Sequence, residues 1–165
     1  PTQELIGDID IKAKNDVVFD CIKTNVLQAL GSAVSDIKNN SATLTLKDLL
    51  VASAFRSLDE QEDLVEQNCV DPNAGKCTPK PGRNLTCIPR DTDGNGSVDG
   101  RNCRHTTGNA LDVWGSGADG KRCCQDEVTR MMKANGFCVL KSEYWHFELK
   151  KNLESDSNRI RMFDC

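Results

Sequence analysis

Hydrophobic residues recur three or four positions apart through the first quarter of the chain. From about Asp16 this spacing is typical of an amphipathic helix, which we predict to run for about six turns and to end near Asn39 and Asn40. Its apolar positions are Val18, Cys21, Ile22, Val26, Leu30, Ala33, Val34 and Ile37. We expect this stripe to pack against the core and to carry no chemistry. The polar residues 1–14 show no clear period and form an arm before the helix.

The next stretch changes to a period of two and then returns to helical spacing. Thr43–Leu46 alternates and Leu49–Phe55 is a short apolar run, so we predict a strand or a pair of strands. Ser57 and Glu60 have the spacing of a capping box, which opens a helix that runs to about Asn68. Its expected buried residues are Leu58, Leu64 and Val65.

The second half of the chain alternates loops with short elements. Gly115–Gly120 is expected to be a flexible loop, and Cys123–Asn135 a short helix that ends at an Asn-Gly pair. Phe137–Leu140 and Trp145–Leu149 predict two antiparallel strands joined through residues 141–144. The methionines expected to fill the core are Met131 and Met132. The fold class is therefore α+β, a small antiparallel sheet flanked by helices, in a single domain of 165 residues.

Nine cysteines are the strongest signal in the composition. They are Cys21, Cys69, Cys77, Cys87, Cys103, Cys123, Cys124, Cys138 and Cys165, and no two have Cys-x-x-Cys spacing. This pattern favours a disulfide framework in an oxidising compartment, with one thiol left over. Residues 69–104 form a cysteine-rich insertion without an apolar period, and such a long loop needs staples. We expect Cys123 and Cys124 to pair with different partners and Cys165 to fix the tail of residues 150–165.

Charge and hydropathy exclude two classes of protein. A net charge of −4 and a pI near 5.2 argue against a nucleic-acid-binding protein. The longest apolar run, Leu49–Phe55, is far shorter than the ~20 residues that cross a bilayer. The chain opens at Pro1, as a mature or trimmed chain would, and three glycosylation sequons (Asn39, Asn84 and Asn95) fit secretion. We expect a secreted monomer.

The insertion contains a sequence that matches most of a calcium-binding loop. In residues 91–99 the oxygen ligands fall at the first, third, fifth, seventh and ninth positions, and a glycine at the sixth position allows the sharp turn. These candidate calcium ligands are Asp91, Asp93, Asn95, Ser97 and Asp99. The twelfth position is Asn102 rather than a bidentate Glu, so a polar glycine-rich turn without an ion is the alternative.

The chain has only two histidines, and each has a carboxylate close by. Asp112 follows His105 by seven residues, and Glu143 precedes His146 by three. Two imidazoles and one carboxylate suit a zinc ion with one open position, and a further carboxylate can act as general base on a water there. Residues three apart on a regular strand face opposite sides, so Glu143 and His146 converge only if Glu143 lies in a turn or bulge.

Other chemistries fit the sequence less well. A surface or hydrogen-bonded role is the ordinary one for a lone His near an acid, and a surface role is the ordinary one for Arg56, at a strand-to-helix junction. A Ser–His–Asp triad lacks its Gly-x-Ser-x-Gly elbow, and a Cys–His pair needs a cysteine outside the disulfides.

Three segments, which follow one another along the chain in the family's order, resemble the motifs of the D-alanyl-D-alanine carboxypeptidase family of VanY-like zinc peptidases. Residues 103–112, Cys-Arg-His-Thr-Thr-Gly-Asn-Ala-Leu-Asp, are similar to the family's Ser-x-His-x-x-Gly-x-Ala-x-Asp motif. Residues 143–146, Glu-Tyr-Trp-His, are similar to its Glu-x-Trp-His motif. Residues 54–61, Ala-Phe-Arg-Ser-Leu-Asp-Glu-Gln, are similar to its Ser-Gly-Tyr-Arg-Ser-x-x-x-Gln segment.

The resemblance implies a fold and an activity. The fold is of the hedgehog/DD-peptidase type, and the zinc ligands are His105, Asp112 and His146. Glu143 is the catalytic base and Arg56 the partner of a substrate carboxylate or oxyanion. The substrate class is the stem peptides of peptidoglycan, with D-Ala-D-Ala carboxypeptidase activity favoured over L-Ala–D-Glu endopeptidase activity.

Two non-catalytic alternatives remain. The chain could be a secreted binding module that keeps a hedgehog-like zinc site for structure, although such a site needs neither Glu143 nor Arg56. It could also be a wall-binding domain that depends on calcium. One departure from the family pattern bears on the site: Cys103 replaces the serine two residues before His105, and a disulfide there would remove a polar contact with substrate.

Overall fold

The computed structural model describes residues 12–14 and 16–165, and these divide into two compact units. One, which we call the sheet unit, comprises the described residues up to 55 and residues 109–165. The other, the insertion unit, comprises residues 56–108. The predicted N-terminal arm lies almost entirely outside the described residues.

The sheet unit contains a six-stranded sheet in the order β1-β2-β3-β5-β4-β6. The strands are β1 (Lys12–Ala13), β2 (Asp48–Ser53), β3 (Ala110–Ser116), β4 (Phe137–Leu140), β5 (Glu143–Leu149) and β6 (Phe163–Asp164). Only the β1–β2 pair is parallel among the described strands, and the five strands from β2 to β6 are antiparallel. The predicted α+β class with a small antiparallel sheet is confirmed.

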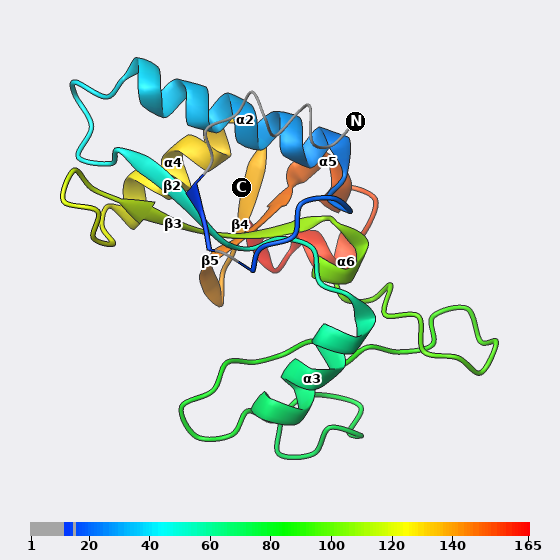
Figure 1. Ribbon diagram of the computed structural model, residues 1–165. Helices are drawn as coiled ribbons and strands as arrows, with labels where there is room; N and C mark the ends of the chain where they lie inside the picture. The colour runs from blue at the N-terminus through cyan, green and yellow to red at the C-terminus, as the bar shows by residue number, and fades with distance from the viewer. Residues whose placement is uncertain (1–11, 15) are drawn as a thin grey trace. The chain divides into compact units, whose positions relative to one another are not determined.

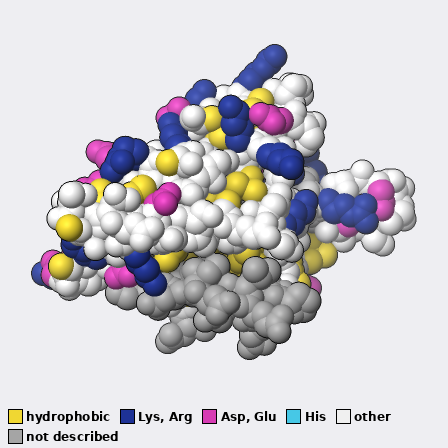
Figure 2. Space-filling view, turned by 90° about the horizontal axis from the view of Figure 1, so that it is seen from above, with side chains coloured by type: hydrophobic (Ala, Val, Ile, Leu, Met, Phe, Trp, Pro, Cys, Tyr) yellow, Lys and Arg dark blue, Asp and Glu magenta, His cyan; other side chains and the backbone are white. Residues whose placement is uncertain are grey.

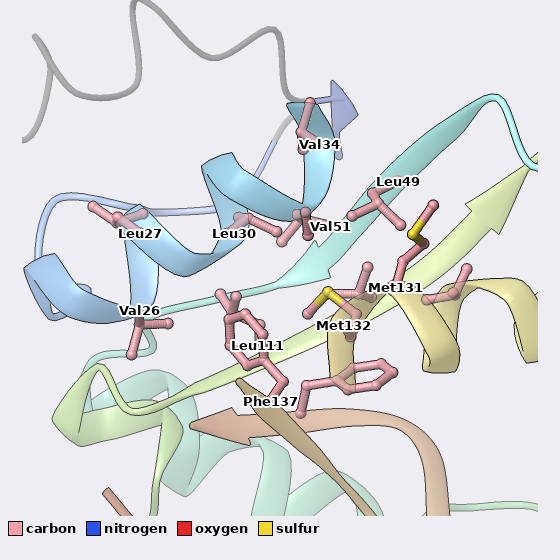
Figure 3. Packing of buried hydrophobic residues seen from close by; sticks show 14 of the residues in the cluster. Val26, Leu27, Leu30, Val34, Leu49, Val51, Leu111, Met131, Met132 and Phe137 are labelled. Atoms are coloured by element: carbon pink, nitrogen blue, oxygen red, sulfur yellow. The ribbon is translucent and has the colours of Figure 1, made fainter. Parts of the chain in front are cut away.

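One face of the sheet carries the main core. Helices α2 (Thr24–Asn39) and α4 (Gln125–Ala134) lie along this face (Figure 1). Figure 3 shows Leu30 of α2 and Met132 of α4 directed toward Leu111 of β3 and Phe137 of β4. All four side chains are buried, and each fully buried aliphatic or aromatic side chain stabilises the fold by roughly 1.5–3 kcal/mol. The apolar stripe of the first helix and the methionine pair therefore pack as predicted.

A smaller cluster lies at the C-terminal end of the sheet unit. Helices α5 (Lys150–Leu153) and α6 (Ser157–Ile160) lead into β6, where Cys165 forms a disulfide with Cys138 of β4. Leu153 and Phe163 pack with Cys138 in this cluster. The expected anchoring of the tail by Cys165 is confirmed.

The insertion unit has one helix, α3 (Leu58–Asn68), and a short 3-10 helix, η1 (His105–Thr107), within residues 56–108. The predicted capping box is present, because the Ser57 side chain accepts from the Glu60 N–H and the Glu60 carboxylate accepts from the Ser57 N–H. Disulfides Cys69–Cys77 and Cys87–Cys103 staple the loops. Val65 is buried as predicted, whereas Leu58 and Leu64 are only half-buried and Gln61 takes the second buried position.

Three predicted boundaries are wrong. Helix α2 begins at Thr24 rather than near Asp16, because Val18 bridges to Phe55 and residues 20–22 form a turn. Thr43–Leu46 is not a strand, since the Glu127 carboxylate accepts from the main chain of Thr45 and Leu46 instead. Strand β3 continues through Gly115 and Ser116, which shortens the loop expected over Gly115–Gly120.

The pairing of the adjacent cysteines was also predicted wrongly. Cys123 and Cys124 form a disulfide with each other, and Cys21 is the exposed free thiol. Cys124 has a φ of 62°, a left-handed conformation that a non-glycine residue rarely adopts. The turn this creates starts α4, because Val128 N–H donates to Cys124 O.

The surface gives two further observations. On the face drawn in Figure 2, basic and acidic side chains are interspersed, without the basic stripe of a nucleic-acid-binding surface. None of the described helices is both long and apolar enough to span a membrane.

Candidate metal centre

Asp112 and His146 lie directly opposite each other on neighbouring strands of the sheet unit. Strands β3 and β5 pair in a register that places Asp112 opposite His146, where side chains on one face are close neighbours. The His146 Nδ1 atom lies 3.2 Å from Asp112 Oδ1. Two candidate ligands from segments 34 residues apart are therefore brought together by strand pairing.

The other ring nitrogen of His146 is held by a carboxylate. His146 Nε2 lies 2.9 Å from Glu148 Oε1, two residues further along β5 on the same face. Arg159 of α6 holds Glu148 in turn: its Nε donates to Glu148 Oε2 at 3.1 Å, and its Nη2 donates to Oε1. A carboxylate on the outer nitrogen fixes the orientation of a metal-ligating His, and Nδ1 on the Asp112 side is left as the donor.

These neighbours set the charge of His146. Burial by itself lowers the pKa of the imidazole, but the hydrogen bonds and negative charges of Asp112 and Glu148 raise that pKa to about 9. Burial raises the pKa of Glu148, and its bonds to His146 and Arg159 more than offset this and lower it. In the metal-free protein near pH 7, His146 is therefore a cation between two carboxylates, and a metal ion has to displace its proton.

Glu143 opens β5 at an irregularity of the sheet. Leu140 of β4 pairs with Glu143, whereas Val139 pairs with Phe147, so the register shifts between the two pairs. The intervening residues 144–146 have no partner on β4 in the described register. Bulges of this kind re-aim side chains and are common next to active sites. This register does not fix the direction of the Glu143 side chain, so its convergence with His146 stays a prediction.

His105 and Arg56 lie in the insertion unit. His105 begins η1, which ends at Gly108 with a left-handed φ of 66°, and β3 follows two residues later. The Arg56 main-chain N–H donates to His105 O at 3.2 Å, so two of the resemblance motifs are joined through their backbones.

Gln61 orients the side chain of Arg56. The Arg56 guanidinium donates to Gln61 Oε1 at 3.2 Å, and Gln61 Nε2 donates to Cys87 O at 2.8 Å. Gln61 is buried, so this amide is fixed in place by its partners. The Arg56 guanidinium is therefore held in a defined orientation by a fixed amide.

Cys103 is buried in the disulfide with Cys87. The family pattern has a serine at this position, and the disulfide-bonded Cys103 offers no hydroxyl group in its place. The disulfide encloses the acidic loop of residues 91–99 and ends two residues before His105.

His105, Asp112 and His146 could together hold a metal ion, since each offers one ligand atom. The chemistry of this donor set fits zinc, which takes two imidazole nitrogens and a carboxylate oxygen and keeps a position for water. The held orientation of His146 agrees with that assignment.

A second acidic group lies within the insertion unit. Carboxylate oxygens of Asp91, Asp93 and Asp99 lie within 4.8 Å of one another and could hold a metal ion. Asp91 accepts from the N–H groups of Gly94 and Gly96, which lower its pKa, and Asn95 accepts from the N–H of Ser97. The loop is thus ordered by its own side chains.

Comparison of the chain with protein-family models gives no match, and comparison with curated proteins gives none either. The site is therefore interpreted from its own residues and from the motif resemblance.

Some residues of the centre were not singled out from the sequence. Glu148 lies two positions after His146, and a strand places such residues on one face, so the spacing was an available signal. Arg159 had no local signal, because its contact with Glu148 depends on how α6 folds back.

Proposed function

We propose that this chain is a secreted zinc-dependent peptidase of the VanY-like type that hydrolyses stem peptides of peptidoglycan. The observation that carries the proposal is the cross-strand Asp112–His146 pair, backed by Glu148 and Arg159. Its four disulfides fit an extracellular protein. The hedgehog/DD-peptidase fold type is part of the same proposal.

In the proposed site His105, Asp112 and His146 hold zinc, which when bound polarises a carbonyl and makes a water more acidic. Glu143 takes the proton from the attacking water and delivers it to the leaving amine. Arg56, oriented by Gln61, pairs with the substrate's terminal carboxylate or with the developing oxyanion. Glu148 keeps the Nδ1 atom of His146 directed to the Asp112 side.

A terminal carboxylate is the natural partner of a positioned arginine, so we favour D-Ala-D-Ala carboxypeptidase activity. An L-Ala–D-Glu endopeptidase is the alternative within the same proposal. A structural zinc module would not require a buried glutamine that orients Arg56.

The deciding experiment measures zinc content and hydrolysis on one preparation. We expect one zinc per chain and release of D-Ala from a pentapeptide that ends in D-Ala-D-Ala. Glu143→Gln should retain zinc and lose at least about 100-fold in kcat, because general base catalysis contributes roughly 10²–10⁴-fold. Full activity in this variant would reject the mechanism, and full zinc content in His146→Ala would reject the ligand set.

The acidic loop supports a second, smaller proposal, that residues 91–99 bind calcium. Three neighbouring carboxylates favour it, and the ion would further restrain the segment that leads to His105. Titration with calcium in the presence of saturating zinc should protect the amides of residues 91–102 from hydrogen exchange. Unchanged exchange at millimolar calcium would reject it.

A further inference from the structure

Both tryptophans and the only tyrosine of the chain form one aromatic cluster, Trp114, Tyr144 and Trp145. The Trp114 and Trp145 rings stack with centroids 5.2 Å apart and planes 16° apart. The Tyr144 ring meets them edge-on, 5.4 Å from Trp114 and 4.9 Å from Trp145. Tyr144 is 54% exposed and both tryptophans are half-buried, so the aromatic cluster borders solvent.

Polar groups hold the aromatic cluster in place. A bridge between Ser116 and Arg122 folds the chain back, and the Arg122 guanidinium lies 4.1 Å from the centre of the Trp114 ring. Gln125 Nε2 donates to Val113 O at 3.0 Å and to Tyr144 O at 3.2 Å, which ties β3 to β5 beyond their last paired residues. The rings are therefore preorganised, and a ligand would lose little free energy in ordering them.

The aromatic cluster is next to the candidate metal centre on the same two strands. Trp114 follows Asp112 by two residues on β3, and Tyr144 precedes His146 by two on β5. Residues two apart on a regular strand share a face and lie roughly 7 Å apart, which places Trp114 beside Asp112 on β3. Tyr144 lies in the irregular part of β5, and its ring contact with Trp114 places it beside that residue. Trp145 lies in the bulge between Glu143 and His146. A molecule that binds the rings would thus border the residues proposed to carry out the reaction.

We propose that the aromatic cluster is a subsite that stacks against a sugar ring of the glycan to which the substrate's stem peptide is attached. This inference rests on the proposed function and names a further part of its substrate. A pyranose has an apolar C–H face and a rim of hydroxyl groups. The half-exposed rings match that face, and the Tyr144 hydroxyl and the Arg122 guanidinium are the polar groups available to the rim.

An aromatic side chain whose only role is to pack in the core is expected to be buried by its neighbours. Tyr144 is instead the one aromatic residue among the large apolar side chains that are exposed in the described part of the chain. The apolar residues that build the main core lie in the other row of β3, at Leu111 and Val113, so the core does not need Trp114 or Tyr144.

The test is a binding titration with a tetramer of N-acetylglucosamine, which carries no peptide. Because both tryptophans belong to the aromatic cluster, tryptophan emission reports directly on this surface. The titration uses the full chain, which needs no inactivating substitution because the tetramer offers no peptide bond to hydrolyse. Tyr144→Ala and Tyr144→Phe are made in this chain, with Met162→Ala as a control at an exposed apolar residue elsewhere in the sheet unit.

We expect a saturable emission change, unaltered by Met162→Ala. Tyr144→Ala should weaken the sugar affinity at least about fivefold, and Tyr144→Phe, which keeps the ring, less than about threefold. No emission change with the tetramer, or an affinity unchanged by Tyr144→Ala, would overturn the inference. Hydrolysis of a sugar-free pentapeptide by the unsubstituted chain tests the proposed function separately, so either proposal can fail while the other holds.

Discussion

His146 is held between two carboxylates, and this makes the metal-free protein sensitive to pH. Its pKa rises from an ordinary 6.5 to about 9 in the folded state. The folded chain therefore keeps a proton that the unfolded chain loses, and the resulting stabilisation is fully present below about pH 6.5 and disappears toward pH 9.

We expect the free energy of unfolding of metal-free protein to fall as pH rises from about 6.5 to about 9. Denaturant unfolding in a chelator at several pH values measures this slope. The His146→Gln variant lacks the titrating group and should show a flatter profile over the same range. A slope that survives in this variant would mean that another group titrates.

Glu148 acts on the centre through His146 rather than by itself contacting a metal. Replacing its carboxylate by an amide keeps the shape and removes the charge that orients and polarises the imidazole. We expect Glu148→Gln to weaken zinc binding about 10- to 100-fold, measured by competition with a chromogenic chelator. Glu154→Gln, at an exposed position of the same unit, is the control. Equal affinities in the two variants would contradict a role for Glu148.

At the scale of elements, the packing of β3 against α4 depends on a residue without a side chain. A Cβ on Gly115 would lie 2.3 Å from Cys123 O, 2.8 Å from Val128 Cγ2 and 2.9 Å from Leu46 Cδ1. The closest of these atoms is backbone, fixed by the bond from Cys123 N–H to Gly115 O, and cannot move alone.

We therefore expect Gly115→Ala to lower the free energy of unfolding by about 2 kcal/mol or more, since β3 or the start of α4 must shift. Gly75→Ala is the matched control, because its Cβ would meet no atom within 4 Å and its φ is not positive. Chemical denaturation of both variants measures the difference. Equal free energies of unfolding in the two variants would show that β3 and the start of α4 can move apart without destabilising the protein.

The elements with a clear local signal were predictable. The capping box of α3 and the periodic stripe of α2 fixed the type of each helix, and the Asn-Gly pair fixed the end of α4. The start of α2 was not predictable from spacing, because Val18 keeps helical periodicity while it pairs with Phe55 far along the chain. Contacts of long sequence separation decide such residues.

In the candidate site, too, some features were predictable from the sequence and others were not. Strand pairing brings the two predicted ligands Asp112 and His146 together, whereas the predicted role of Glu143 stays a prediction. The bond between Cys123 and Cys124 and the tie made by Gln125 have no signature in residue spacing. Cysteine counting gives the number of bonds but not their partners.

At the scale of the whole molecule, the two units are stabilised by different means. The sheet unit has a large continuous core. In the insertion unit the described core consists of Val65 with Cys69 and Cys77, and Ile88 packs against it. A cluster of this size cannot order a loop-rich segment, so the disulfides Cys69–Cys77 and Cys87–Cys103 carry much of its stability.

We expect the double substitution Cys87→Ser with Cys103→Ser to destabilise the insertion unit locally. A disulfide that closes a loop of about 15 residues contributes roughly 3 kcal/mol, and this one spans 16 positions. Hydrogen exchange should speed up across residues 88–102 while β3 and β5 keep their protection. The matched control is Cys138→Ser with Cys165→Ser, whose effect should be confined to β4 and β6. Faster exchange throughout both units would show that the chain unfolds as a single cooperative body.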